Sequence, residues 1–293
     1  MNNSTKKALI TLVSFVVYVL LSKLYYVQFW EVLSANIGDS HLSSFLVSLL
    51  LALPIAVGAL LLDKAADFPR NIGLQGNIRQ GLRVGWVALF TFMLLIIILS
   101  LASRYVLMIF LDFLNIFTSP SLLFFTLLTL LLDAIIDQGF IFRNLFQHTR
   151  LGVLPIVLII ALVPAVIGFI FFLSHPSYSG TTLWHTAAFV GYIFTDTLLI
   201  VLLNTFWIAW LYVEWKMNIW VVIFVQMVVN LLYMCFHNLY INALIIASVV
   251  IYTVIYKRKH KLPFEVNKDN LWVKKHKEED DNNTQEVIRW NNV

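Results

Sequence analysis

The sequence carries little charge for its length. Of its 293 residues, 12% are Asp, Glu, Lys or Arg, whereas 60% are hydrophobic, and apolar runs long enough to span a bilayer recur along most of it. Backbone groups in hydrocarbon are satisfied only in helices or closed barrels. Because the period-2 alternation of barrel strands is absent, we expect an all-α fold, a polytopic bundle of transmembrane helices.

Cysteine is also nearly absent, and several catalytic motifs are missing. The single Cys235 excludes an intramolecular disulfide and a Cys-rich zinc site. There is no HExxH pair for a zinc protease and no GxGD motif for an aspartyl protease. Ser179-Gly180 lacks the preceding glycine of a GxSG turn. We therefore predict no cofactor and no tightly bound metal.

The apolar runs predict about eight spans. They divide the chain into an N-terminal transmembrane region (1–119), a core (120–236), a last transmembrane helix (237–260) and a tail (261–293). The mixed charge and few core-forming residues of the tail predict disorder. The expected spans are 8–29, 44–62, 84–102, 121–147, 153–174, 185–213, 218–236 and 239–256.

Loop charges support an even number of spans. With the N-terminus inside, one side of the membrane holds nearly all of the basic loop residues, and the other side holds little beyond Arg104 and Lys23. The positive-inside rule then places both termini in the cytoplasm. The cytoplasmic basic residues are Lys6, Lys7, Lys64, Arg70, Arg79, Arg83, Arg150, Lys216, Lys257, Arg258, Lys259 and Lys261.

The span at 121–147 is the one with the most polar groups. Charged residues at membrane depth usually face a bundle interior or a wet cavity, so this helix is expected to contribute to the functional site. At 100° per residue, four of its polar residues lie within about 80° of one another, whereas Gln138 points away. That predicted polar stripe consists of Asp133, Asp137, Asn144 and Gln147.

Three short motifs follow one another in the core. Gln138-Gly139-Phe140-Ile141-Phe142-Arg143 has the spacing of EExxxR, Phe171 to His175 fits FxxxH, and Gln226 to Asn230 has the spacing of HxxxN. In this order they resemble the motifs of the CPBP family of CAAX-protease and bacteriocin-processing membrane proteins, also called Abi proteins. The resemblance covers roughly residues 120–235.

The resemblance implies an intramembrane endopeptidase that acts on prenylated proteins or on bacteriocin or pheromone precursors, or a role in bacteriocin immunity. In that family the first glutamate activates a water, and histidines with asparagine stabilise the oxyanion. Here Gln138 cannot accept the proton, although Gln226 can still donate a hydrogen bond. Two alternatives stay open: a pseudoprotease, or a peptidase in which Asp137 is the base. The implied site residues are Asp137, Gln138, Arg143, His175, Gln226 and Asn230.

Other functions remain open beside peptidase activity. One is a non-catalytic membrane partner of a cell-envelope enzyme or sensor, similar to the lysostaphin-resistance protein A branch of the family. Another is a small-molecule transporter, although no paired inverted halves are visible. Expected partners are a peptide or membrane protein and membrane lipids, without nucleic acid, in a bacterial cell membrane. On straight helices Gln138 and His175 lie too far apart, so their meeting requires a kink at Pro155 or Pro164.

Overall fold

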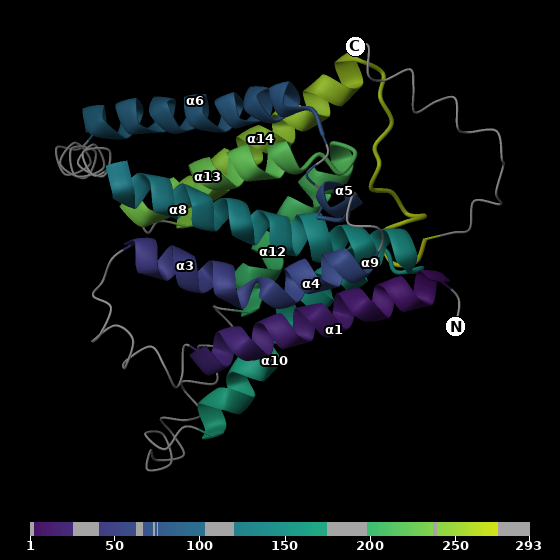
Figure 1. Ribbon diagram of the computed structural model, residues 1–293. Helices are drawn as coiled ribbons and strands as arrows, with labels where there is room; N and C mark the ends of the chain where they lie inside the picture. The colour runs from purple at the N-terminus through teal and green to yellow at the C-terminus, as the bar shows by residue number, and fades with distance from the viewer. Residues whose placement is uncertain are drawn as a thin grey trace.

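The computed structural model describes residues 3–25, 41–62, 67–72, 74, 76–102, 120–174, 198–236 and 239–274. Within these ranges the fold is all-helical, and the one β-bridge joins Leu151 to Val273. Figure 1 shows long helices packed side by side in a bundle. The elements are α1 (Asn3–Leu24), α3 (His41–Leu51), α4 (Leu53–Leu62), α5 (Phe68–Asn71), α6 (Ile78–Ala102), α8 (Pro120–Ala134), η3 (Ile135–Phe142), α9 (Arg143–His148), α10 (Val153–Ser174), α12 (Leu198–Glu214), α13 (Ile219–Phe236) and α14 (Leu239–Lys259).

Several helices have the length and composition of membrane spans. Among the described residues, 3 helices are long and apolar enough, at Asn3–Leu24, Ile78–Ile98 and Val153–Phe171. A fourth candidate is the pair α3–α4, which bends by 41°. Their outward faces carry large apolar side chains such as Leu50, Trp86 and Phe90, as expected for surfaces that face lipid. The all-helical prediction is confirmed, whereas the count of eight spans stays a prediction.

Most basic loop segments predicted to share one side of the membrane gather at one end of the bundle. Figure 1 shows the start of α1, α5, α9 and the end of α14 there, and we call it the basic end. The α12–α13 turn belongs to it too, because Glu214 at the end of α12 pairs with Lys257 near the end of α14. Which side of the membrane the basic end faces stays a prediction.

Close packing of α6 on α13 depends on two glycines one helical turn apart. A Cβ on Gly81 would lie 2.6 Å from the carbonyl carbon of Trp220, and one on Gly85 would lie 2.7 Å from Cβ of Phe224. Small residues at this spacing let helix backbones approach each other within a membrane. At the basic end, the Asn218 amide donates to the Asn77 carbonyl at 3.0 Å, which ties the start of α13 to the start of α6.

A buried ion pair joins α12 to α14. Nζ of Lys257 lies 2.5 Å from Oε2 of Glu214, and both side chains are almost fully buried. The carboxylate also accepts the backbone N–H groups of Glu265 and Val266, at 3.1 and 2.9 Å, and the ammonium donates to the carbonyl of Pro263 at 2.8 Å. Such additional hydrogen bonds are what a buried pair needs to offset the desolvation of its charges.

The segment after α14 crosses the basic end as an extended strap, residues 262–274 (Figure 1, yellow). The N–H groups of Gly152, Val153 and Leu154, which the start of α10 leaves without helical partners, donate to carbonyls of the strap. Their acceptors belong to Trp272, Asn270 and Leu271, at 2.8, 3.0 and 2.9 Å. The strap therefore caps α10.

Lys274, at the end of the strap, caps the C-terminal end of α9. Its ammonium donates to the carbonyl of Phe146 and lies 4.5 Å from the centre of that ring. A cation at a helix C-terminus is favourable because it meets the unsatisfied carbonyls there. Burial lowers the pKa of Lys274 from its ordinary value. The prediction of disorder from residue 261 onward is thus wrong for residues 261–274, whereas residues 275–293 lie outside the described ranges.

We expect Lys257→Met to lower the free energy of unfolding by about 3–5 kcal/mol, because it leaves the Glu214 carboxylate buried without its cation. Thermal unfolding of the purified protein in detergent measures the loss. The double variant Lys257→Met/Glu214→Gln removes both charges and should lose less. If the double variant is as unstable as the single one, the ion pair is not the cause.

We expect Gly152→Ala to displace the strap, because a Cβ on Gly152 would lie 2.4 Å from the Asn270 carbonyl oxygen. Overpacking would then destabilise the contact between the strap and α10 by about 1–3 kcal/mol. Because the strap would detach more often, limited trypsin cleavage at Lys268 should speed up by about tenfold or more. Gly168→Ala is the matched control, since its Cβ would meet only the flexible Lys23 side chain, at 3.3 Å. Equal cleavage rates in both variants would contradict the capping role of the strap.

Candidate functional site

The polar helix at the centre of the bundle contains a π-helical segment, η3. It continues α8 from Ile135 to Phe142 and passes into α9 at Arg143. The N–H of Arg143 bonds to the carbonyl of Gln138, five residues back, which is the i→i−5 pattern of a π-helix. The Asn144 amide supports the wide turn by donating to the Phe140 carbonyl at 2.7 Å. π-Helical segments inside α-helices occur often at functional sites.

The π-helical turn overturns the predicted polar stripe. A π-helix turns through less than 100° per residue, so residues after it fall on a different face from the one that α-helical geometry predicts. Asp133 and Gln147 are exposed and Asp137 is half-buried, whereas Asn144 is buried. Gln138, which was expected to point away, is instead one of the most buried polar residues, at 2% exposure.

Gln138 is buried, and Gly139 beside it lies against Ile72, which follows α5. The side-chain oxygen of Gln138 is buried and has no hydrogen-bond donor among the described residues. A Cβ on Gly139 would lie 2.1 Å from the carbonyl oxygen of Ile72 and 3.0 Å from Cδ1 of Ile219 on α13. The backbone at Ile72 therefore fills the space that a side chain at position 139 would need.

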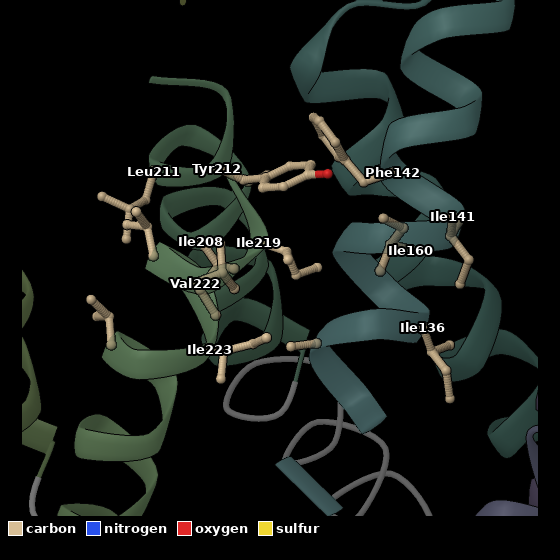
Figure 2. Close-up of a cluster of buried hydrophobic side chains, with 14 of the residues drawn as sticks. Ile136, Ile141, Phe142, Ile160, Ile208, Leu211, Tyr212, Ile219, Val222 and Ile223 are labelled. Carbon is tan, nitrogen blue, oxygen red and sulfur yellow. The ribbon is translucent and has the colours of Figure 1, made fainter. Parts of the chain in front are cut away.

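Tyr212 on α12 is a site residue that the sequence does not reveal. Its ring meets Phe142 edge-on, with centroids 6.0 Å apart, and Phe142 stacks on Phe146 at 5.7 Å. Figure 2 shows the Tyr212 hydroxyl directed toward the helix that carries Phe142. That hydroxyl is fully buried without an acceptor among the described residues, and half-buried Arg143 directly follows Phe142 in the chain. A Tyr in an apolar run has no sequence signal for this role.

The helix that carries the second motif does not break. α10 runs continuously from Val153 to Ser174 with Pro164 inside it. Its 22 residues rise by roughly 33 Å, so its last residue, Ser174, lies far from the basic end. α10 therefore has no break and no separate surface segment that would bring its end toward Gln138. His175 itself lies outside the described residues, whereas Phe171, at the start of the motif, is in the helix.

Contacts with α1 and α4 set the relative depth of η3 and the second motif. Phe140 reaches the level of Ser14, since both would touch a Cβ on Gly58, at 3.0 Å and 2.8 Å. Gly168 of α10 lies beside Lys23, nine residues farther along α1. At 1.5 Å per residue, the two levels are roughly 14 Å apart along the bundle. The first and second motifs are therefore at different depths.

The third motif lies farther from the basic end than η3, near the level of Gly168. Ile219 touches the position of Gly139, and Gln226 and Asn230 follow it on α13 by roughly 10 and 16 Å. The side-chain oxygen of Gln226 is buried without a donor among the described residues. The side chain of Asn230 lies outside the described set. The structure thus brings Tyr212 against Phe142, the residue before Arg143, and places Gln226 farther from the basic end than Gln138, whereas His175 and the side chain of Asn230 lie outside the described residues.

No group of three or more His, Cys, Asp or Glu side chains that could hold a metal ion occurs in the part of the chain that the structure describes. Gln138, Arg143 and Tyr212 supply amide, guanidinium and phenol groups, which donate and accept hydrogen bonds. The carboxylates that precede Gln138 in this helix are Asp137 and, one turn earlier, Asp133. Comparison with family models, curated proteins and solved structures finds no match for this chain.

Proposed function

We propose that this chain is an integral membrane protein related to the CPBP family that binds a peptide or membrane-protein partner without cleaving it. The observation that carries the proposal is the placement of Gln138 and Gly139. These residues stand at the positions of the paired glutamates in the family motif, and both are buried.

Neither position supplies the carboxylate that peptide hydrolysis needs. A general base must accept a proton from water, and the amide of Gln138 cannot do so at neutral pH. At position 139 a longer side chain would meet the backbone of Ile72, so a glutamate there requires a different path for residues 67–74. Substituting two glutamates would therefore not be enough to rebuild the pair, because the backbone of Ile72 occupies the space at position 139.

What remains favours binding. Gln138, Tyr212 and Gln226 each bury a polar oxygen that no described donor or acceptor satisfies. Buried polar groups are usually hydrogen-bonded, so each exception calls for an explanation. Backbone amides and carbonyls of an extended peptide would be suitable partners. Arg143 adds a charge for an acidic group or a chain carboxylate.

A second candidate is a peptidase with Asp137 as its base. Asp137 is half-buried, unlike Gln138, so it retains access to its surroundings, and it lies on η3 directly beside the motif. A carboxylate in a poorly solvated site can be tuned to act as a general base. The shorter side chain and the different face of the helix distinguish it from the family arrangement.

We expect the wild-type protein in nanodiscs to leave a library of prenylated and unmodified peptides uncleaved, and Asp137→Asn to behave identically. Mass spectrometry of the peptides after incubation measures cleavage. Gln138→Glu restores one carboxylate without adding a side chain at position 139. This variant tests whether the missing base alone prevents cleavage. Cleavage by the wild type that Asp137→Asn abolishes would overturn the proposal in favour of the second candidate.

We expect Gly139→Ala to destabilise the protein by about 1–3 kcal/mol, because its Cβ would meet the Ile72 carbonyl, a backbone atom that cannot turn aside. Thermal unfolding in detergent measures the change, with Gly168→Ala as the control. A fully stable Gly139→Ala variant would mean that the backbone at Ile72 moves away from the added Cβ without a loss of stability. Position 139 would then be open to a glutamate.

A further inference from the structure

The strap presents an unusual surface for a segment at the end of a membrane bundle. Its backbone is fixed by hydrogen bonds to α10 and by the Glu214 carboxylate, yet three of its large apolar side chains are exposed. Phe264 is 40% exposed, Trp272 57% and Val273 61%. Because the backbone is held in place, these side chains stay exposed instead of folding back onto the bundle.

Basic residues alternate in sequence with these exposed apolar residues. Lys257 is neutralised by Glu214, but five further basic residues between positions 258 and 274 are exposed or half-buried, against two acidic residues, Glu265 and Asp269. The five are Arg258, Lys259, Lys261, Lys268 and Lys274. The strap and the end of α14 therefore combine apolar and cationic groups on one segment.

The position of the strap restricts what can cover it. It crosses the basic end of the bundle over the turn between α9 and α10, beside the first residues of a candidate membrane span (Figure 1). Side chains at that level meet the boundary between acyl chains and headgroups, where Trp is enriched. Basic residues next to apolar ones at this boundary attract anionic lipid.

We propose that the strap, with the end of α14, is a binding surface for the anionic phospholipid headgroups of the membrane in which the protein sits. The ammonium and guanidinium groups contact headgroup phosphates, and Trp272 and Phe264 reach the upper part of the acyl chains. A bound lipid would hold the strap against the start of α10. This inference rests on the position of the strap at the end of a membrane span and is independent of the proposed function.

Quenching of tryptophan fluorescence by brominated lipid tests the proposal. The full-length protein is placed in phosphatidylcholine nanodiscs that contain a minor, equal fraction of brominated phosphatidylglycerol or brominated phosphatidylcholine. Because the chain has 9 Trp residues, the difference between the wild type and Trp272→Phe isolates the signal of Trp272. We expect brominated phosphatidylglycerol to quench Trp272 more strongly than brominated phosphatidylcholine does.

Charge removal separates a lipid site from general attraction to the basic end. Lys259→Gln/Lys268→Gln should weaken the preference for phosphatidylglycerol by about fivefold per charge removed. Lys6→Gln/Lys7→Gln removes the same charge from α1 at the same end and should retain the preference. The proposal is overturned if neither lipid quenches Trp272, which would leave the surface for a protein partner. Equal quenching by both lipids, or equal losses in both double variants, would overturn it as well.

Discussion

The ion pair between Glu214 and Lys257 is the interaction on which the basic end of the bundle depends. It joins two residues that are 43 positions apart in sequence, on α12 and α14, and its carboxylate also accepts hydrogen bonds from the strap. A charge buried without a partner is expensive, so neither residue is stable there alone. Once paired, they determine where the chain leaves α14, and the strap then reaches the start of α10. This electrostatic contact therefore helps to order a segment whose large apolar side chains Phe264, Trp272 and Val273 stay exposed.

A second constraint acts inside the bundle, where glycines set how closely the helices approach. Gly81 and Gly85 admit α13 onto α6, and Gly139 admits the Ile72 carbonyl onto η3. Helices in a membrane gain little from hydrophobic burial against one another, so close packing of this kind supplies much of their association. At Gly139 the same packing has a chemical consequence, because it fills the place that a second motif carboxylate would occupy. A close approach of the Ile72 backbone and a glutamate side chain at position 139 exclude each other, and this chain has the close approach.

The sequence predicts the helices well and their mutual contacts poorly. The span expected at 153–174 matches α10, and the helix expected from 121 begins at Pro120, because apolar run length determines where a membrane helix forms. The π-helical turn was not predictable, since it depends on how neighbouring helices hold η3. Gln138 and Asn144 are both buried, whereas a regular 100° periodicity places Asn144 in the polar stripe and Gln138 outside it.

The strap was missed for a related reason. The charged tail 261–293, of which it is the first part, reads as disordered from its composition, whereas the order of the strap comes from backbone hydrogen bonds to helix ends that no composition reveals. Likewise, Tyr212 gains its place at the candidate site only from the crossing of α12 and η3. Single residues with a motif spacing were predictable, whereas residues defined by a neighbour on another helix were not.

The strap and the candidate site are connected through aromatic rings. Lys274 lies over Phe146, which stacks on Phe142, and Phe142 meets Tyr212 edge-on. Each contact fixes the ring of the next, since stacked and edge-on pairs have preferred geometries. Because Phe142 ends η3 and precedes Arg143, the position of the strap bears on the two residues that give the site its phenol and its charge. A strap held at the membrane surface would therefore keep this part of the site rigid. Rigidity of this kind favours binding, because a preorganised site loses less entropy when a partner is bound.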